Sequence, residues 1–385
     1  MDVIGGNRVT LLKNGAEFFP ALIAAIDNAK VDVRIENYIF EADDAGKRIA
    51  AALGNAAKRG VPVRVLIDGV GSWHTPIVFF ENMRQAGVKL LMFRPVRKWF
   101  GFRRSQLRRM HRKISLIDGR IGFVGGINFI DDLNGSLSEH PRYDYAVQIE
   151  GPLLAQIYPT VHLMWRWAAW RYFRRRDAED KPVVVNMAPA GHHDAAFVMR
   201  DSVRNRRSIE RTYTRAIAHA KSDVLIVCPY FLPGRHLRRV LIKAAARGVR
   251  ITILLQGRAD HPLLQLATRA LYAQLLAAGI SVCEYQKSML HGKVAVVDDS
   301  WATVGSSNLD PFSLFLNREA NVVVLDAAFA QHLRESVMAE IGEGAVTCLL
   351  EDWQKRPYWE RIRSWLAYGF ARWAAGMLGV ARHWD

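Results

Sequence analysis

Cysteine is scarce in this sequence. The chain has 385 residues but only three cysteines, Cys228, Cys283 and Cys348, which form neither a C-x-x-C pair nor a cluster with metal-ligand spacing. So few and so distant thiols argue against a disulfide framework and are typical of a reducing compartment. The length is ample for a hydrophobic core and favours two domains.

Long apolar runs are missing as well. No uninterrupted apolar stretch reaches the roughly 18–20 residues that a membrane-spanning helix needs, so the sequence predicts no transmembrane helix. Residues 1–9 contain no basic segment followed by an apolar one, so they predict no signal peptide. With 50% hydrophobic and 23% charged residues, the composition is that of a globular protein.

Acidic residues are outnumbered by basic ones. The chain has 53 Lys and Arg against 37 Asp and Glu, which gives a formal net charge of +16 at pH 7. This excess favours an anionic partner, either nucleic acid or an acidic membrane surface. The alternative is a basic surface without a specific partner.

Two segments of the chain share one pattern. Residues 110–128 and 290–308 both contain H-x-K, four residues, D, six residues and G-[GS]-x-N. The first copy supplies His111, Lys113, Asp118, Gly126 and Asn128, and the second supplies His291, Lys293, Asp298, Ser306 and Asn308. Because the spacing is identical, we interpret the two copies as paired halves of one site.

The residue types of this pattern suit chemistry on a phosphate. In a strand, residues i and i+2 face the same side, so we expect His111 and Lys113 to project together. The Asp118-Gly119 turn would then bring Asn128 back near His111. Histidine can act as a nucleophile or as an acid and base, and lysine supplies charge to phosphate oxygens without a metal. A single H-x-K is more often structural, but its duplication favours a functional interpretation.

Strands alternate with helices in both parts of the chain. The pattern predicts strands at 9–12, 31–40, 61–67 and 88–93 and helices at 15–28, 45–59 and 77–86, with a second series of helices at 208–220 and 237–247 and strands at 224–230 and 249–255. This alternation predicts an α/β fold with a mainly parallel sheet.

The second series repeats the first. The segment 56–69, AAKRGVPVRVLIDG, is similar to 244–257, AAARGVRITILLQG. We therefore expect two similar α/β halves with pseudo-two-fold symmetry and an active site at their interface. The expected boundaries are 1–176 for the N-terminal half, 177–350 for the C-terminal half and 351–385 for an amphipathic tail.

Four segments resemble the phospholipase D superfamily, and within it the bacterial cardiolipin synthases in their B form, which has no N-terminal membrane spans. They are MHRKISLIDGRIGFVGGIN, YDYAVQIEGP, LHGKVAVVDDSWATVGSSNLDPFSL and NREANVVV. The similarity extends over nearly the whole chain. It implies two phospholipase D-like halves that share one site.

The resemblance also implies roles for the site residues. One motif histidine forms a phosphohistidine and the other is the acid and base; we expect His111 as nucleophile and His291 as acid and base. An acid downstream of each motif should orient its histidine, which assigns Asp144 to His111 and Glu319 to His291. The expected phosphate ligands are Lys113, Lys293, Asn128, Ser306 and Asn308. Asp118 and Asp298 belong to the motif, but we expect them to stabilise the turns.

The implied reaction joins two phosphatidylglycerol molecules into cardiolipin and releases glycerol, with phosphatidylethanolamine as another conceivable donor. It requires no cofactor and no metal. Rival interpretations are a phosphatidylserine synthase, a lipid hydrolase, a nuclease or a non-enzymatic membrane-binding scaffold. The complete motif sets argue against the scaffold, and no nucleic-acid partner is expected. The sequence does not indicate the oligomeric state.

Three segments combine cations with aromatic residues, which suits an anionic bilayer. Residues 94–113 hold nine Lys or Arg and no acid around Trp99, Phe100 and Phe102. Residues 165–176 and 364–384 mix Trp, Tyr and Arg, and the second contains Trp365 and Trp373. A solvated loop or ordinary packed helices are the alternatives. We expect a peripheral protein on the cytoplasmic face of the bacterial inner membrane.

Overall fold

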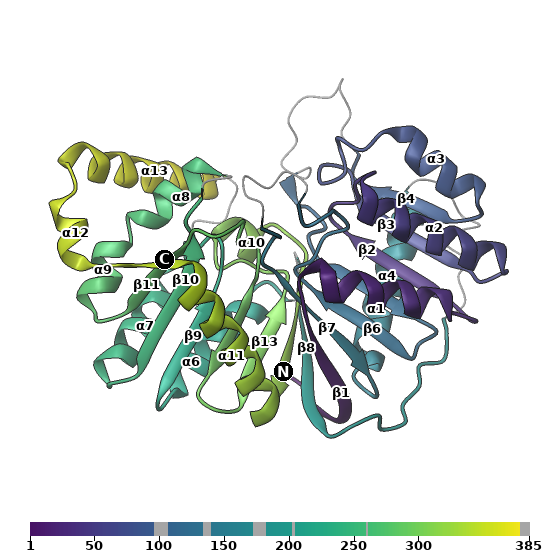
Figure 1. The fold of residues 1–385 in the computed structure, drawn as a ribbon, viewed down its shortest axis with the longest axis horizontal. Helices are drawn as coiled ribbons and strands as arrows, with labels where there is room; N and C mark the ends of the chain where they lie inside the picture. Colours follow the sequence, from purple (N-terminus) through teal and green to yellow (C-terminus); the bar gives the residue numbers. More distant parts are fainter. Residues whose placement is uncertain (96–106, 134–139, 172–181, 202–204, 259–260, 378–385) are drawn as a thin grey trace.

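A computed structural model describes residues 1–95, 107–133, 140–171, 182–201, 205–258 and 261–377. Its strands form one sheet with 15 members in the order β15-β11-β10-β9-β12-β13-β14-β8-β1-β7-β6-β5-β2-β3-β4. Helices cover both faces of this sheet (Figure 1). The α/β class predicted from the sequence is therefore confirmed.

The N-terminal half contributes one end of the sheet. Its elements are β1 (Ile4–Lys13), α1 (Asn14–Asp27), β2 (Val33–Asn37), α2 (Asp44–Lys58), β3 (Val63–Asp68), α3 (Ile77–Gln85), β4 (Lys89–Phe93), β5 (Lys113–Ile117), β6 (Ile121–Gly125), β7 (Tyr145–Glu150) and α4 (Leu154–Arg171). The predicted strands and helices of this half all overlap observed ones.

The C-terminal half repeats this series and adds elements at its end. It consists of β8 (His193–Arg200), α6 (Ser208–His219), β9 (Asp223–Val227), α7 (Arg235–Ala246), β10 (Arg250–Gln256), α8 (Pro262–Arg269), α9 (Tyr272–Ala277), β11 (Ser281–Tyr285), β12 (Val294–Val297), β13 (Trp301–Gly305), α10 (Pro311–Phe315), β14 (Glu319–Leu325) and α11 (Ala327–Gly344). The added elements are β15 (Ala345–Cys348), α12 (Leu350–Lys355) and α13 (Tyr358–Met377).

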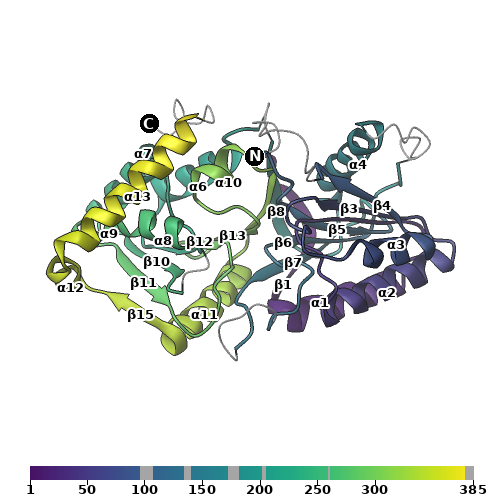
Figure 2. The same ribbon diagram turned by 90° about the horizontal axis from the view of Figure 1, so that it is seen from above.

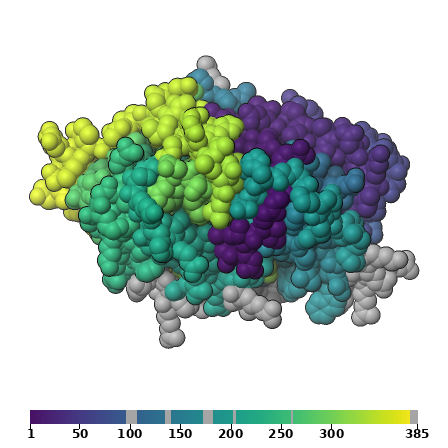
Figure 3. Space-filling model, turned by 90° about the horizontal axis from the view of Figure 1, so that it is seen from below, coloured from purple at the N-terminus to yellow at the C-terminus, as the bar shows by residue number. Residues whose placement is uncertain are grey.

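The sheet order shows how the halves correspond. From the centre outward, β1-β7-β6-β5-β2-β3-β4 on one side matches β8-β14-β13-β12-β9-β10-β11 on the other. The central pair is antiparallel, with Ile4 opposite Ala195 and Asn7 opposite His193. On the surface, the first residues of the chain lie between the two halves (Figure 3). The expected boundary at residue 176 falls outside the described residues and stays a prediction.

The sequence predicted a mainly parallel sheet, and this prediction is wrong. Only β2-β3, β3-β4, β9-β10 and β10-β11 are parallel among the described pairings. Each motif forms a hairpin, β5-β6 or β12-β13, that inserts antiparallel strands beside the βαβ units. The central seam is antiparallel too. Alternation of strands and helices reveals the parallel part and says nothing about these insertions.

The repeated A-A-x-R-G segments end helices α2 and α7. Gly60 and Gly248 follow these helices with φ of 87° and 91°, a left-handed conformation that glycine adopts without strain. Helices α1 and α2 lie on the same face of the sheet as α11, whereas α6 and α7 lie on the other face with α4 (Figure 2). This exchange of faces is what a two-fold relation between the halves requires.

Helix α13 buries one side against the C-terminal half. Ala367, Tyr368, Ala371 and Ala375 belong to the core of that half, which also contains residues of α6 to α9. The opposite side exposes a stripe at three- to four-residue spacing, which consists of Trp359, Ile362, Leu366, Phe370, Trp373 and Met377. Among the residues described, no helix has the length and apolar character needed to cross a membrane.

Candidate active site

His111 lies two residues before β5, in a segment that crosses to the other half. Met110 forms an isolated parallel bridge with Arg318. The His111 backbone N–H donates to the Arg318 carbonyl at 3.0 Å, and the Arg318 N–H donates to the Arg109 carbonyl at 2.8 Å. The strand predicted from His111 therefore begins only at Lys113, because the preceding residues pair with the C-terminal half.

His291 repeats this arrangement in the opposite direction. Leu290 forms a parallel bridge with Tyr143 of the N-terminal half. The His291 N–H donates to the Tyr143 carbonyl at 2.8 Å, and the Tyr143 N–H donates to the Met289 carbonyl at 2.9 Å. Each histidine is thus held by backbone hydrogen bonds to the half that does not contain it.

The carboxylates that contact the histidines are crossed between the halves. Nδ1 of His111 lies 3.1 Å from Oε2 of Glu319, and Nδ1 of His291 lies 2.5 Å from Oδ2 of Asp144. The predicted assignment of Asp144 to His111 and of Glu319 to His291 is therefore wrong. The cause is the backbone pairing, because each acid directly follows the residue that pairs with the opposite motif.

These contacts determine which ring nitrogen of each imidazole carries the proton. The histidine side chains are 12% and 16% exposed, while Glu319 and Asp144 are 0% and 6% exposed. A carboxylate at Nδ1 holds the ring proton there, so the lone pair of a neutral ring is on Nε2. Both rings are then oriented for chemistry at Nε2.

Gly126 and Ser306, the one difference between the motif copies, lie beside the two acids. A Cβ at Gly126 would be 2.2 Å from Oδ1 of Asp144, so this carboxylate needs glycine there. The Ser306 hydroxyl donates to Oε2 of Glu319 at 2.6 Å and accepts from the Ala320 N–H at 3.1 Å. We expected Ser306 to bind phosphate, but this fully buried hydroxyl positions Glu319 instead.

The two lysines lie behind the histidines. Nζ of Lys113 donates to the His111 carbonyl at 2.7 Å, and Nζ of Lys293 donates to the His291 carbonyl. An ammonium group has three N–H donors, so Lys113 can also donate to an anion. Tyr38 covers this group: its ring centroid is 4.8 Å from that of His111 and 5.3 Å from Nζ of Lys113.

Tyr38 is a site residue that the sequence did not single out. In the repeat of the two halves, Tyr38-Ile39-Phe40 corresponds to Tyr230-Phe231-Leu232, and this correspondence is the signal that could have identified it. Burial raises the pKa of Tyr38 to about 12, so its phenol is neutral. It forms an aromatic wall next to His111.

Burial lowers the pKa of both histidines. For His111, the Glu319 carboxylate opposes this effect and Lys113 adds to it. For His291, the neighbouring Lys293 and Lys113 strengthen it, so that its pKa falls well below the usual value. Both isolated imidazoles therefore favour the neutral form at neutral pH, as a nucleophile requires.

The partner groups titrate near neutrality. Burial raises the pKa of Asp144 to about 7, although Lys293 opposes it. Burial lowers the pKa of Lys113 to about 7, although Glu319 opposes it. Asp144 and His291 are in direct contact, so they titrate as one pair, which holds an additional proton around neutral pH.

The motif asparagines are buried next to the hairpins. Oδ1 of Asn128 accepts a hydrogen bond from the Ile39 N–H at 3.2 Å, which leaves its N–H groups for another partner. Oδ1 of Asn308 is buried and has no hydrogen-bond partner among the described residues. A phosphate ligand for either amide stays a prediction.

Two side chains hold the residues before the histidines. The carboxylate of Asp68, at the end of β3, accepts from the Met110 N–H at 2.9 Å and from Nε of Arg109 at 2.9 Å. At the end of β10, Oε1 of Gln256 accepts from the Leu290 N–H at 2.8 Å. The two histidines are therefore positioned by equivalent contacts with different chemistry.

The motif aspartates lie at the hairpin turns and bind the segments that precede β2 and β9. The Asp118 carboxylate accepts from the backbone N–H groups of Lys30, Val31 and Asp32 at 2.7–2.9 Å. Asp298 accepts in the same way from Lys221, Ser222 and Asp223. Both aspartates lie at the far ends of the hairpins, about five residues or roughly 16 Å along the strand from the lysines.

Of the predicted membrane-contacting residues, two are described, and both are exposed. Trp99, Phe100 and Phe102 lie outside the described residues. Trp365 and Trp373 lie on α13 and are 57% and 61% exposed. In the segment 165–176, Trp170 is exposed whereas Trp165 is buried, so α4 presents part of its aromatic content to the surface.

One group among the described residues has the composition of a metal site: His192, His193 and Asp326. Nδ1 of His193 accepts from the Val9 N–H at 3.0 Å, so Nε2 of the neutral ring carries its proton. That nitrogen lies 3.8 Å from Oδ1 of Asp326, whose side chain also caps α11 at Phe329. This tautomer does not suit metal ligation through Nε2.

The chain matches a known protein family over most of its length. Its residues 22–159 and 213–339 match the family described as "Cardiolipin synthase, PLD-like domain". The protein belongs to this family of phospholipase D-like cardiolipin synthases, which confirms the resemblance noted in the sequence. The chain is 40% identical over 379 residues to Cardiolipin synthase B of Escherichia coli strain K12, which covers 97% of this chain and 90% of that protein.

More distant relatives agree with this placement. A cardiolipin synthase of Geobacillus kaustophilus is 30% identical, over 92% of this chain and 70% of that protein. The crystal structure of phosphatidylserine synthase from Haemophilus influenzae superposes with a TM-score of 0.70 at 16% identity, over 97% of this chain and 95% of that chain. At that identity the structural likeness shows the fold alone.

Proposed function

We propose that this protein is a cardiolipin synthase that transfers a phosphatidyl group from one phosphatidylglycerol molecule to another. The observation that carries the proposal is the pair of crossed histidine–carboxylate contacts, each backed by a lysine. Membership of the family supports the choice of a phospholipid substrate. The lysines would stabilise the charge on the phosphate oxygens during attack.

In the first half-reaction, the Nε2 lone pair of His111 attacks phosphorus. The bond from phosphorus to the head-group glycerol oxygen breaks, and that oxygen takes a proton from the Asp144–His291 pair. Glycerol leaves and a phosphatidyl-histidine remains. A covalent intermediate of this kind divides one difficult displacement into two easier ones.

In the second half-reaction, the terminal hydroxyl of another phosphatidylglycerol attacks the same phosphorus. The Asp144–His291 pair accepts the hydroxyl proton, and the bond between phosphorus and His111 breaks. Cardiolipin leaves, and every group returns to its initial protonation state. The same pair is thus acid in one step and base in the next.

The raised pKa of Asp144 supports His291 as the acid and base and His111 as the nucleophile. A nucleophile needs a neutral ring, which burial favours at both positions. A general acid needs a proton near neutral pH, and the Asp144 pKa of about 7 lets its pair with His291 hold one. This proton on the Asp144–His291 pair assigns the acid and base role to His291 and leaves attack to His111.

The reaction can be tested with phosphatidylglycerol vesicles followed by lipid chromatography. We expect the wild-type protein to form cardiolipin and glycerol and His111→Ala to form neither. His332→Ala, an exposed histidine on α11, is the matched control and should keep full activity. Phosphatidic acid as the only product would indicate hydrolysis, and oligonucleotide cleavage without lipid products would indicate a nuclease; either result would overturn the proposal.

We also infer peripheral binding to the anionic membrane surface on the cytoplasmic side. The exposed stripe of α13 supports this, because its aromatic residues suit the interface. Cations accompany the stripe: the guanidinium of Arg363 lies 5.5 Å from the ring of Trp359, and that of Arg361 lies 5.4 Å from Tyr358. Each cation near an anionic surface contributes about 1 kcal/mol.

A second exposed apolar group lies over the other half. Val70 and Trp73, between β3 and α3, and Ile77 and Val78, in the first turn of α3, are all exposed. Helices α3 and α13 lie along the same upper side of the molecule, one over each half (Figure 1). A bilayer that contacts both groups would be held at two points.

Sedimentation with phosphatidylglycerol liposomes tests the membrane contact. We expect Trp365→Ser with Trp373→Ser to weaken binding about tenfold or more, since two interfacial aromatic side chains are lost. Point substitutions are preferable to removal of α13, because its other side is part of the core. Met338→Ser, at an exposed position of α11, is the control. Unchanged sedimentation of the double variant would contradict this role of α13.

A further inference from the structure

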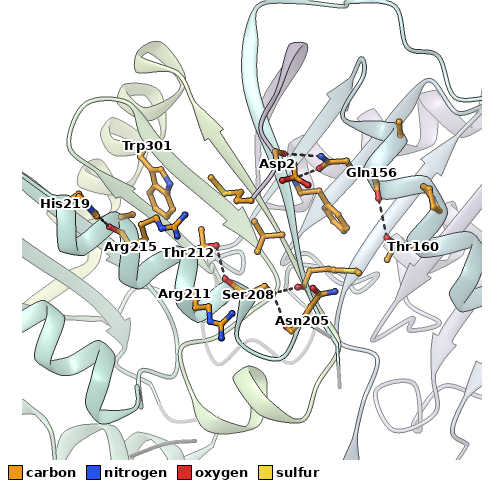
Figure 4. A pocket seen from close by; sticks show the side chains of 17 residues that line it. Asp2, Gln156, Thr160, Asn205, Ser208, Arg211, Thr212, Arg215, His219 and Trp301 are labelled. Atoms are coloured by element: carbon orange, nitrogen blue, oxygen red, sulfur yellow. Dashed lines mark hydrogen bonds between the residues drawn. The ribbon is translucent and has the colours of Figure 1, made fainter. Parts of the chain in front are cut away.

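A pocket of about 1030 Å³ lies between the two halves, and none of the motif histidines, lysines, aspartates or asparagines lines it. It is bounded by α4 of the N-terminal half, by α6 of the C-terminal half and by strand β8 between them (Figure 4). Its size is that of a site for a substantial organic ligand, and the junction of two units is a common place for one. The proposed reaction leaves this pocket without a role.

The floor and one end of the pocket are apolar. Phe197 and Met199 of β8 point to the same face of the sheet, as alternate residues of a strand do. Pro159 of α4 and Trp301 of β13 add apolar walls. Such a surface suits a hydrocarbon chain, which gains about 25 cal/mol for each Å² removed from water.

Cations line the wall formed by α6. Arg211, Arg215 and His219 recur every four residues, so they lie on one face of this helix and border the pocket together. Figure 4 shows them on the side opposite Gln156. Neither arginine forms a salt bridge with a described residue, and Asp2 is the only acidic residue in the lining. Glu210 on the same helix attracts Arg211 without lining the pocket, so the wall has an excess of positive charge.

The other polar groups of the pocket already have partners. The Gln156 amide donates to the Asp2 carbonyl at 3.1 Å and accepts from the Phe197 N–H at 3.3 Å. The Thr212 hydroxyl donates to the Ser208 carbonyl at 2.9 Å. Recognition of a ligand would thus depend on the arginines and on the apolar floor, not on these side chains.

We propose that this pocket binds one anionic phospholipid at a second, non-catalytic site. An acyl chain would lie on Phe197, Met199 and Trp301, and the phosphate would contact Arg211 and Arg215. The charge of the wall selects an anionic ligand. A planar guanidinium donates two hydrogen bonds to two oxygens of one phosphate, whereas a cationic amphiphile would be repelled. The inference goes beyond the proposed reaction and does not require it.

The pocket is linked to the active site through β8. Arg200, next to Met199, is paired with Glu319 in the register of β8 and β14. The Arg200 guanidinium also donates to the carbonyl of Asn317, next to the residue that pairs with His111. A lipid in the pocket would therefore contact the strand beside the carboxylate that orients His111. We expect its occupancy to change turnover modestly, by about two- to threefold.

The test is photolabelling of the full-length protein with dodecyl phosphate that has a diazirine in its chain, followed by peptide mapping. We expect labelled residues within 155–160 and 197–199 and at Trp301. Labelling there should fall roughly tenfold in Arg211→Gln with Arg215→Gln, because two charged contacts to phosphate are lost. Arg239→Gln with Lys243→Gln, an exposed pair with the same spacing on α7, should label like the wild type.

Two further arms separate the possible outcomes. A dodecyl trimethylammonium probe should not label the pocket, and equal labelling would mean apolar adhesion without recognition of phosphate. His111→Ala should lose cardiolipin formation yet keep the labelling, so failure of the proposed reaction leaves this result independent. Labelling that maps elsewhere, or that is unaffected by the double arginine substitution, would overturn the proposal.

Discussion

The two histidines have the same geometry but different surroundings. Around His111, the carboxylate of Asp68 binds Arg109, and buried Glu36 binds Arg112 through Nη2 at 2.8 Å. At the corresponding positions near His291, 180 residues further along, the motif has Met289 and Gly292, and an amide, Gln256, holds the backbone. The backbone segment before His111 is held by ion-paired side chains, and the segment before His291 is held by a neutral amide.

This difference separates what the reaction needs from what the fold needs. The features common to both halves are the histidine, its lysine, the crossed acid and the backbone pairing that brings them together. Two quite different sets of supporting side chains hold the same backbone segment. The ion pairs near His111 are therefore one structural solution among others, and we expect their loss to affect folding more than chemistry.

The largest effect should come from the histidines themselves. His111→Ala and His291→Ala should each lower cardiolipin formation by about 10³-fold or more, because each removes a reacting group. Their intermediates should differ. After brief exposure to acyl-labelled phosphatidylglycerol and denaturation, we expect a covalent lipid adduct on His291→Ala and none on His111→Ala. An adduct on His111→Ala alone would reverse the two roles.

The next effect concerns the ion pair that only the first half possesses. Glu36→Gln leaves the buried Arg112 without its charged partner and should lower the free energy of unfolding by about 3–5 kcal/mol. Glu36→Leu combined with Arg112→Leu should cost less, because no unpaired charge remains. Chemical denaturation measures both. If the single variant is as stable as the wild type, the pair does not support the fold.

The two acids should then be compared directly. Glu319→Gln and Asp144→Asn each remove the charge that holds a histidine and should reduce kcat by about 10²-fold or more. Their pH profiles should differ. As pH rises through the Asp144 pKa of about 7, the Asp144–His291 pair loses its proton and activity should fall. This alkaline decline should persist in Glu319→Gln and become shallower in Asp144→Asn, where Lys113 is the group that still titrates near 7.

Stability gives an independent check on the raised pKa of Asp144. Its folded-state pKa of about 7 exceeds the ordinary aspartate value of 3.8, so the folded state binds more protons between these values. The contribution of this group to stability therefore falls as pH rises through that range. The unfolding free energy of Asp144→Asn should decline less between pH 5 and about 8 than that of the wild type. An identical decline would mean that Asp144 is ionised throughout.

The smallest effect should come from the position at which the motif copies differ. Gly126→Ser places a side chain against Asp144 and should reduce activity by about 10–100-fold, since the carboxylate must move. Ser306→Gly removes one hydrogen bond from Glu319 and should cost about tenfold or less. Steady-state rates on phosphatidylglycerol test the order. Equal losses would mean that the two acids tolerate the same change.

The sequence predicted the order of the elements well, because periodic apolar patterns and helix-ending glycines such as Gly60 and Gly248 are local signals. It did not predict that most strand pairings in the sheet are antiparallel. Hairpins β5-β6 and β12-β13 add antiparallel pairings, and the position of a hairpin among other strands depends on contacts between distant parts of the chain. The same limit applies to β15, which joins the sheet edge beside β11.

The site was predicted as a set of residues but not as a set of partners. The duplicated motif identified the histidines and lysines, and the structure places them together. The assignment of Asp144 and Glu319 failed because proximity in sequence was used where backbone bridges between the halves decide. Tyr38, Asp68 and Glu36 were missed as site residues because single polar residues on buried strands have no distinctive spacing.

The central β1-β8 seam joins what could otherwise be two identical subunits. A symmetric dimer of one half would have to use the same acid, and the same residue beside it, at both histidines. In one continuous chain the two copies can change separately, as Gly126 beside Asp144 and Ser306 beside Glu319 illustrate. Covalent fusion thus allows the proposed division of labour, in which one histidine attacks phosphorus and the other moves protons.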